Sequence, residues 1–292
     1  MNASFTSINN SGTSASANAQ GYLLGSGPIP QILLAIVVAA ILYIIMMALE
    51  IIYTTWLKAS RSRVDVLPYR ISPDDKMRTI IQNPNAPNSM NLPLSDNERT
   101  GAEFTYSFFM YVNPSTMDNT ESLRHVFHKG YTRLTPLMGP GVFIKSNDNS
   151  LRVYMNSSKR WDNYVDVPNI PLKKWVHISI VGRKNSVEIY VNGNIAKKMK
   201  IDGVIYQNYQ DLILFSQRTG GAGGRITHSD GTIIEVKGPY SGSFASLAYF
   251  SYALSYSEIQ DLLKEGPSTV VDQTGGAEVT SPYLVDSWWT NS

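Results

Sequence analysis

The chain has no cysteine among its 292 residues, which excludes a disulfide framework and any thiolate metal site. This absence fits a domain that faces a reducing compartment, although many extracellular domains also lack disulfide bridges. Neither sign of charge dominates, because 25 Lys and Arg stand against 23 Asp and Glu. The net charge of +2 therefore gives no reason to expect nucleic acid as a partner. Aromatic residues are abundant instead, with 17 Tyr, 9 Phe and 5 Trp, and such residues are typical of β-sheet surfaces.

Charged residues are absent from the first 49 positions, and Ile32–Leu49 consists only of Ala, Val, Ile, Leu, Met and one Tyr. Continued to Leu57, this run predicts a helix of about 26 residues and roughly 39 Å, enough to cross a bilayer with some tilt. Tyr53 and Trp56 lie where interfacial aromatic residues are expected. A signal peptide would need a basic start and a shorter apolar core, and buried core helices are rarely this apolar. The sequence therefore predicts a transmembrane helix.

Three basic residues, Lys58, Arg61 and Arg63, follow this helix, and none precedes it. The positive-inside rule then predicts a single-pass protein whose C-terminal domain lies on the cytoplasmic side, with the short N-terminus across the membrane. Glu50 has three alternative interpretations. It marks the edge of the membrane, its side chain reaches toward the lipid headgroups, or it pairs with another helix. The lipid bilayer is thus the first partner that we expect.

Composition divides the chain into five parts. The first part is rich in Ser, Asn, Ala and Gly, which predicts a flexible tail. The third part contains five prolines among Asn, Ser and Asp, which predicts an extended, stiffened linker. We therefore expect a polar tail (1–28), a transmembrane helix (29–57), a Pro/Asn-rich linker (58–100), a β-rich domain (101–266) and a C-terminal tail (267–292).

Apolar residues alternate with period two from Ala102 onward, which predicts a first strand with one apolar face made by Phe104, Tyr106, Phe108, Met110 and Val112. Further candidate strands follow at short, regular spacing. Asn192-Gly193 is the strongest hairpin signal, because both residues tolerate positive φ. One helix is expected near the end, where Ser255 and Glu258 form a capping box. Many short strands with little helix predict an antiparallel sandwich.

The central strands resemble those of a known family. Trp175-Val-His177, then Tyr190-Val-Asn192-Gly193, and later the aromatic run that leads into Ser255-Tyr-Ser-Glu-Ile, are similar to motifs of the laminin G-like, concanavalin A-like lectin/glucanase superfamily. The resemblance covers about residues 100–266. It implies an all-β, antiparallel jelly-roll sandwich of the concanavalin A type, preceded here by one transmembrane α-helix. This fold hosts lectins, hydrolases and adhesion modules, so the resemblance alone implies no function.

Glycosidases of this fold resemble one another in a strand of the form E-x-D-x-x-E, which places the acid and the nucleophile on one face about 5 Å apart. No such run occurs here, and Glu188 stands alone. We therefore predict that the protein is not an enzyme and has no catalytic residue.

Four histidines could hold a metal, His125, His128, His177 and His228, but the first two are expected on opposite faces of one strand. His177 matches a structural position of the family. Asn147–Asn149 offer oxygen ligands in a loop, and the resemblance implies that calcium could bind at a sandwich rim. These residue types are also ordinary turn formers, which is the favoured interpretation. We predict no metal and no cofactor, with calcium as the alternative.

Two aromatic segments are candidates for contact with a partner. Trp161 and Tyr164, in the run Trp161-Asp-Asn-Tyr164, resemble the aromatic and amide side chains with which lectins of this fold bind sugars. Trp288 and Trp289, close to the C-terminus, either pack back on the sandwich or anchor another protein, since Trp is favoured at binding hot spots.

Membrane-anchored laminin G-like proteins with Asn/Ser-rich tails look similar to proteins of large DNA viruses of algae and protists, in which an inner membrane lies beneath an icosahedral shell. This similarity implies a non-enzymatic structural protein, a minor capsid or virion membrane protein that tethers the inner membrane to capsid proteins. The alternative is a membrane-anchored, lectin-like carbohydrate-binding protein, which is disfavoured because a cytoplasmic domain meets few glycans.

Overall fold

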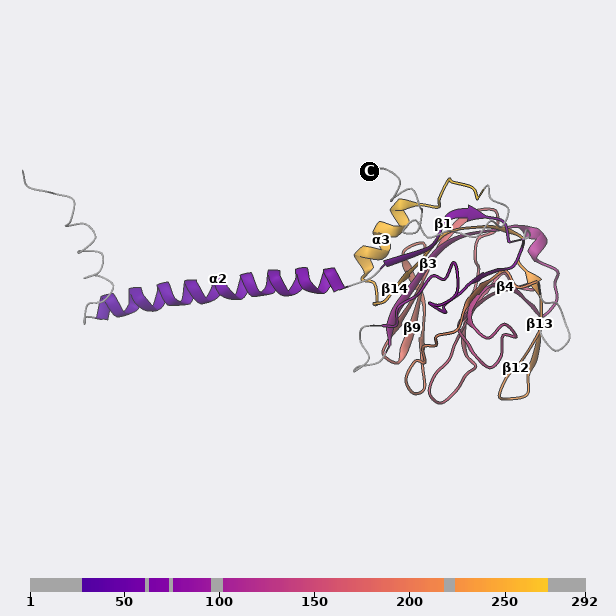
Figure 1. Cartoon of the computed structure of the whole chain (residues 1–292), viewed down its shortest axis with the longest axis horizontal. Coiled ribbons are helices and arrows are strands. Elements are labelled where there is room, and N and C mark those ends of the chain that lie inside the picture. The colour runs from indigo at the N-terminus through magenta and orange to yellow at the C-terminus, as the bar shows by residue number, and fades with distance from the viewer. Residues whose placement is uncertain (1–27, 61–62, 74–75, 96–101, 218–223, 273–292) are drawn as a thin grey trace, which may run out of the picture. The chain divides into compact units, whose positions relative to one another are not determined.

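The computed structural model describes residues 28–60, 63–73, 76–95, 102–217 and 224–272 (Figure 1). The chain divides into two compact units between Ser60 and Arg61. The described part of the first unit is one long helix, and the described part of the second contains two β-sheets, as the sequence predicts.

Helix α2 (Pro28–Ser60) makes up the described part of the first unit. Pro28 and Pro30 lie in its first turn, where a missing backbone N–H breaks no helical hydrogen bond. Within the helix, Pro28–Tyr53 is long and apolar enough to cross a membrane, and none of its most apolar stretch is buried against protein. At 1.5 Å per residue this span measures about 39 Å, more than the roughly 30 Å of a hydrocarbon core.

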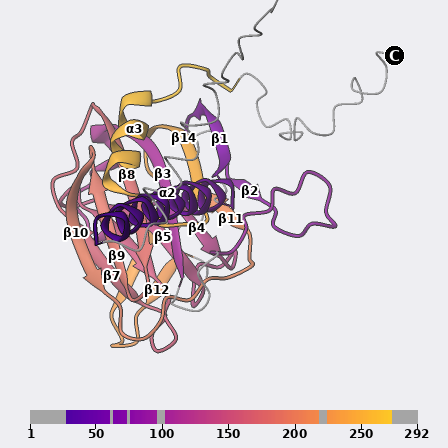
Figure 2. The same cartoon turned by 90° about the vertical axis from the view of Figure 1, so that its left-hand side faces the viewer.

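The second unit is a sandwich of two sheets (Figures 1 and 2). Sheet A has six antiparallel strands in the order β1 (Arg63–Ile71), β14 (Gly242–Phe250), β3 (Glu103–Val112), β8 (Trp175–Arg183), β9 (Ser186–Val191) and β10 (Asn194–Lys200). The main path of sheet B runs through β12 (Arg225–Thr227), β13 (Ile233–Pro239), β4 (Ser122–Gly130), β5 (Met138–Lys145), β6 (Leu151–Met155) and β7 (Asn163–Val167). Strand β11 (Leu212–Leu214) pairs with β4 and with β2 (Arg78–Ile80), and a short 3-10 helix, η1 (Pro114–Thr116), follows β3.

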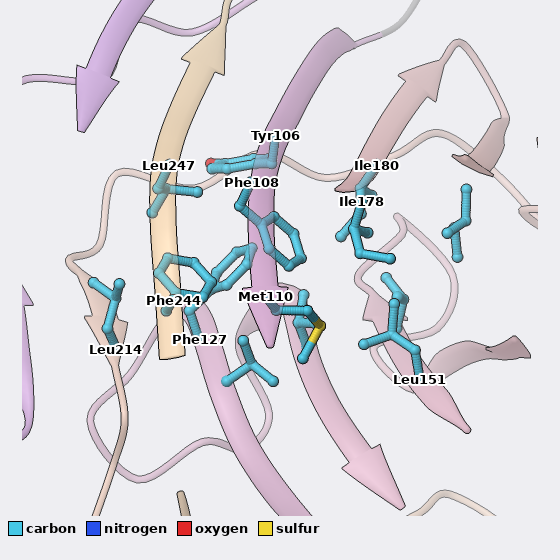
Figure 3. Close-up of a cluster of buried hydrophobic side chains, with 14 of the residues drawn as sticks. Tyr106, Phe108, Met110, Phe127, Leu151, Ile178, Ile180, Leu214, Phe244 and Leu247 are labelled. Atoms are coloured by element: carbon cyan, nitrogen blue, oxygen red, sulfur yellow. The ribbon is translucent and has the colours of Figure 1, made fainter. Parts of the chain in front are cut away.

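The core lies between the two sheets and contains the apolar face predicted for the first strand. Tyr106, Phe108 and Met110 of β3 are each at most 2% exposed and belong to the central apolar cluster, which confirms the predicted apolar face. Figure 3 shows Phe108 beside Phe244 of β14 and Phe127 of β4, with ring centroids 5.2 and 5.3 Å away. Aromatic contacts therefore join the two sheets across the centre.

Helix α3 (Tyr256–Glu265) covers part of the outer face of sheet A. Its Ile259 and Leu262 pack in one cluster with Val181 of β8 and Phe250 of β14. The predicted capping box is confirmed, because the Ser255 side chain accepts from the Glu258 backbone N–H while the Glu258 carboxylate accepts from Ser255. The predicted turn before β10 is also confirmed, with φ of 48° and 77° at Asn192 and Gly193.

The extended linker predicted for residues 58–100 is wrong for much of its length. Arg63–Ile71 forms the edge strand β1, and Leu92 is buried, with its N–H donating a hydrogen bond to Gln82 Oε1 at 3.0 Å. Pro68 concealed this strand. It lies within the register shift between Leu67 and Arg70 of this edge strand, where irregular pairing with β14 accommodates its missing N–H. Pro68 therefore marks irregular strand pairing and not a spacer.

The start of the predicted C-terminal tail also belongs to the sandwich. The Arg70 N–H donates to the Val270 carbonyl at 2.7 Å, and the Asp272 N–H donates to the Arg70 carbonyl at 3.0 Å. Residues 270–272 therefore cover the edge of sheet A at Arg70, near the end of β1. Trp288 and Trp289, predicted as partner contacts, lie outside the described residues.

Candidate functional site

The predicted contact segment Trp161–Tyr164 joins β6 to β7 on the outer face of sheet B. In the ladder between these strands, Tyr154 lies opposite Tyr164, and Arg152 lies opposite Asp166. Residues two apart on a strand share a face, so that the two cross-strand pairs form one cluster. We call these four residues, together with His228, the Tyr164 cluster.

Arg152 is the electrostatic centre of the Tyr164 cluster. Its Nε and Nη2 donate to the two Asp166 oxygens at 2.7 and 2.6 Å, and its guanidinium lies 4.2 Å from the centre of the Tyr164 ring. Burial alone would lower the pKa of Arg152, but the hydrogen bonds to Asp166 raise it, so the guanidinium stays charged. Because the Arg152 side chain is only 8% exposed, the ion pair acts as a fixed support for the two tyrosines.

His228 reaches the cluster from the β12–β13 connection. Its Nε2 lies 2.8 Å from the Tyr154 hydroxyl, and its ring is 5.2 Å from that of Tyr164. Burial lowers the pKa of His228, and the nearby Arg152 lowers it further, so the imidazole is neutral at pH 7. Asp162 fixes the same connection, because one of its oxygens accepts from the Ser229 N–H at 2.7 Å.

The exposed part of this surface is small. Tyr164 is 43% exposed, whereas Trp161 is half-buried against the apolar cluster beneath it. Asp162 is buried, and the Asn163 amide donates to three acceptors within its own loop. The structure therefore brings Trp161 and Tyr164 onto one side of the sandwich but leaves the two polar residues between them in structural roles. Such a surface can offer ring contact and a phenol hydrogen bond.

A family model described as the concanavalin A-like lectin/glucanases superfamily matches residues 87–260. The chain belongs to this superfamily. No curated protein sequence matches the chain significantly.

Solved structures with a similar chain path include binding domains of botulinum neurotoxins. The receptor binding domain of mosaic serotype C/D has 10% identity and a TM-score of 0.45, over 71% of this chain and 46% of that chain. The binding domain of serotype DC in complex with rat synaptotagmin II has 13% identity and a TM-score of 0.44, over 70% of this chain and 46% of that chain. The present chain thus spans a little under half the length of those structures. At this identity and TM-score, the similarity implies no shared function.

The glucanases of this superfamily need a pair of free carboxylates. The carboxylate of Glu188 is not free, because three donors contact it. Its oxygens accept from Lys198 Nζ at 2.7 Å, Arg183 Nε at 3.2 Å and the Tyr190 hydroxyl at 3.1 Å. Burial would raise the pKa of Glu188, but these partners lower it, which keeps the carboxylate ionised and occupied. A catalytic acid needs the opposite environment, one that raises its pKa.

The expectation that His125 and His128 lie on opposite faces is wrong. Their rings touch, with His125 Nε2 2.7 Å from His128 Nδ1. A register shift between His125 and Phe127 is the reason, since the extra residue of a bulge moves later side chains to the other face. The Ser216 N–H donates to His125 Nδ1, and His128 Nε2 donates to the Tyr131 carbonyl, so both rings are neutral and fully bonded.

His177 is buried on the outer face of sheet A, 1% exposed. Its Nε2 lies 2.8 Å from the Ser107 hydroxyl, and its Nδ1 is buried with no hydrogen-bond partner among the described residues. Burial lowers the pKa of His177 to about 4. Across the part of the chain that the structure describes, no three His, Asp or Glu side chains are grouped so that they could hold a metal.

The segment considered for calcium forms the turn between β5 and β6. Asp148 accepts from Lys145 Nζ at 2.8 Å and from the Ser150 N–H at 3.2 Å, and Asn149 has a φ of 47°. These contacts are those of an ordinary Asx-type turn.

The predicted anchor residues fall into four groups, of which Arg63 is the last. Ile32, Leu49 and Tyr53 are exposed on α2, at 61%, 59% and 61%. Trp56 and Lys58 lie in α2, but the structure describes only their backbone. Arg61 lies outside the described residues.

Arg63 was expected only to flank the membrane, but it begins β1. It bonds to Asp65 and Glu265 and lies over the Phe250 ring. Sequence reasoning missed these contacts because the edge strand itself was missed.

Proposed function

We propose that the protein is a single-pass, membrane-anchored and non-enzymatic interaction protein, in which α2 holds a concanavalin A-like sandwich at a bilayer. The observation that carries this proposal is the apolar span Pro28–Tyr53, whose most apolar stretch has no side chain buried against protein. A soluble protein would need to cover such a surface, because an exposed apolar patch of this size promotes aggregation.

The anchor is tested by expressing the full chain and a variant without residues 29–57, and by floating both with vesicles in a density gradient. The full chain is expected to float and to resist extraction at alkaline pH, while the variant stays in the soluble fraction. A full chain that alkaline carbonate releases from membranes would overturn the proposal.

Lys58, Arg61 and Arg63 support the cytoplasmic orientation of the sandwich through the positive-inside rule. Protease added to sealed, right-side-out cells should then leave the sandwich intact, and permeabilisation should expose it. Cleavage in intact cells would reverse the assigned topology.

The non-enzymatic part of the proposal is supported by the three donors that occupy Glu188. We expect no hydrolysis of β-glucans by the full chain. Activity that disappears in Glu188→Gln would contradict this part of the proposal while leaving the anchor untouched.

The finer proposal is a place in a virion, where the sandwich would link an inner membrane to capsid proteins. Its support is the similarity of an Asn/Ser-rich tail, a membrane helix and a laminin G-like domain to proteins of large DNA viruses. Mass spectrometry of purified virions tests it, together with density for the sandwich between membrane and shell. Absence of the chain from purified particles would refute it.

A second candidate function is glycan binding through the Tyr164 cluster, favoured by the 43% exposed Tyr164 ring above a charged Arg152. On a glycan array, the full chain in detergent should bind a defined set of sugars, and Trp161→Ala and Tyr164→Ala should weaken that binding. The matched control is Tyr256→Ala, an exposed tyrosine on α3. An array without signal would remove this candidate.

A further inference from the structure

Three loops leave sheet B at the same end of the sandwich. The first joins β4 to β5 and begins after Gly130, and the second joins β6 to β7 and begins after Met155. The third joins β10 to β11 and ends before Leu212. The loops are bonded to one another: the Tyr206 N–H donates to the Asn156 carbonyl at 2.9 Å, and the Asn156 amide donates to the Pro136 carbonyl at 2.9 Å. We call residues 131–137, 156–162 and 201–211 together the loop end.

The loop end exposes aromatic and aliphatic side chains that its packing does not use. Tyr131 is 42% exposed, Val204 52%, Tyr206 54% and Tyr209 76%. Tyrosine combines an apolar ring with a polar tip, so it is favoured where a protein meets the headgroup region of a membrane.

Basic residues stand beside these side chains. Arg133 lies 5.9 Å from the Tyr131 ring. Lys159 pairs with Asp202 at 2.9 Å and Arg160 with Asp162 at 3.2 Å. Acidic partners therefore offset most of the positive charge, so a bilayer without net charge fits this surface as well as an anionic one.

The chain enters the sandwich at this same end. Strand β1 begins at Arg63, opposite Phe250, and Phe250 is paired in turn with Thr105. A small pocket connects this end of sheet A to the loop end, because Phe104 and Tyr249 line it together with residues 207 and 208. Only residues 61 and 62 separate β1 from the last residue of α2.

We propose that the loop end is a membrane-contact surface, on which Tyr131, Val204, Tyr206 and Tyr209 insert among lipid headgroups. The proposal rests on the proposed membrane anchor. A lipid surface is favoured over a protein partner because the exposed residues are interfacial types and because the chain arrives at this end directly from the apolar helix.

The natural chain contains no cysteine, so single cysteines can report on each end of the sandwich. The full chain is reconstituted into phosphatidylcholine vesicles, and an environment-sensitive fluorophore is attached at Tyr209→Cys. Lys174→Cys is the matched control, because Lys174 is also exposed but lies just before the first residue of β8, at the opposite end. A quencher is carried on a fraction of the lipids, near the headgroup.

We expect a blue-shifted emission and several-fold stronger quenching at position 209 than at position 174, with little change when phosphatidylserine is added. Equal quenching at the two positions, in protein that floats with the vesicles, overturns the membrane-contact surface and leaves the anchor standing. Protein that does not float with vesicles overturns both. Shielding of position 209 that needs an added protein, and not lipid, assigns the loop end to a protein partner and also overturns the proposal.

A second pair of variants separates contact from folding. With the fluorophore at Val204→Cys, the double substitution Tyr206→Ser and Tyr209→Ser should abolish most of the quenching. The far-ultraviolet circular dichroism should stay unchanged, since both rings are exposed. Undiminished quenching would show that these tyrosines do not carry the contact.

Discussion

Protonation of His177 should destabilise the sandwich below neutral pH. Burial lowers the pKa of this imidazole from 6.5 to about 4. Between these two pH values the imidazole is protonated in the unfolded chain but neutral in the folded chain. The stabilisation is therefore complete above pH 6.5 and is lost progressively as the pH falls from 6.5 to 4. The pKa of His177 thus differs by about 2.5 between the unfolded and the folded chain, which corresponds to about 3 kcal/mol of unfolding free energy.

The assay is urea unfolding of the full chain in detergent micelles, followed by tryptophan fluorescence at several pH values between 7.5 and 4.5. His177→Phe keeps a ring beside Phe109, whose centroid lies 4.7 Å away, but cannot titrate. Ser107→Ala is the matched control, since it removes the 2.8 Å contact to the imidazole and leaves the titrating group.

Both variants should be less stable than the natural chain at pH 7.5, but only His177→Phe should lose its share of the pH dependence. His125 and His228, whose pKa values burial also lowers, contribute the same slope to all three proteins and cancel in the comparison. If the natural chain and His177→Phe lost equal free energy between pH 7.5 and 4.5, the assignment to His177 would be refuted.

Two further predictions concern single contacts and are checked by the same unfolding assay. A Cβ at Gly130 would lie 1.7 Å from the Leu137 carbonyl oxygen, so Gly130→Ala should cost about 3 kcal/mol or more. Gly231→Ala, in open space at a φ of 86°, should cost only about 1 kcal/mol, and equal losses would contradict the steric argument. Asp166→Asn should cost about 2 kcal/mol, because it leaves the guanidinium of Arg152 without its counter-charge, while the 29% exposure of Asp166 limits the loss. An unchanged urea midpoint would show that the pair adds no stability.

Local patterns in the sequence predicted the sandwich because alternation and turn chemistry are short-range signals. Phe108 and Met110 could be assigned to the core from their period-two spacing, and Asn192-Gly193 to a hairpin from its tolerance of positive φ. Strand β1 escaped because Pro68 suggested a spacer. A proline is tolerated in β1 because β1 lies at the edge of sheet A. The order of strands in a sheet is a property of the whole fold, so the local sequence could not reveal this edge position.

The candidate site was predictable only in part. Trp161 and Tyr164 could be selected by residue type, but the Arg152–Asp166 pair depends on the register between β6 and β7, which no local pattern specifies. The contact between Tyr154 and His228 joins residues 74 positions apart, beyond the reach of any short motif. The His125–His128 contact depends on a bulge whose position the side chains alone do not reveal.

The edge position of β1 has a consequence for the synthesis of this protein. Arg63 pairs with Phe250, a separation of 187 positions (250 minus 63), so the first strand to leave the ribosome is among the last to find its partner. At ~5–20 residues per second, roughly 10–40 seconds pass before β14 has been made. During that interval β1 is an unpaired strand, separated by only two residues from the apolar helix α2. Among the strands that the structure describes, β1 is therefore the one exposed longest to pairing with a neighbouring chain during synthesis.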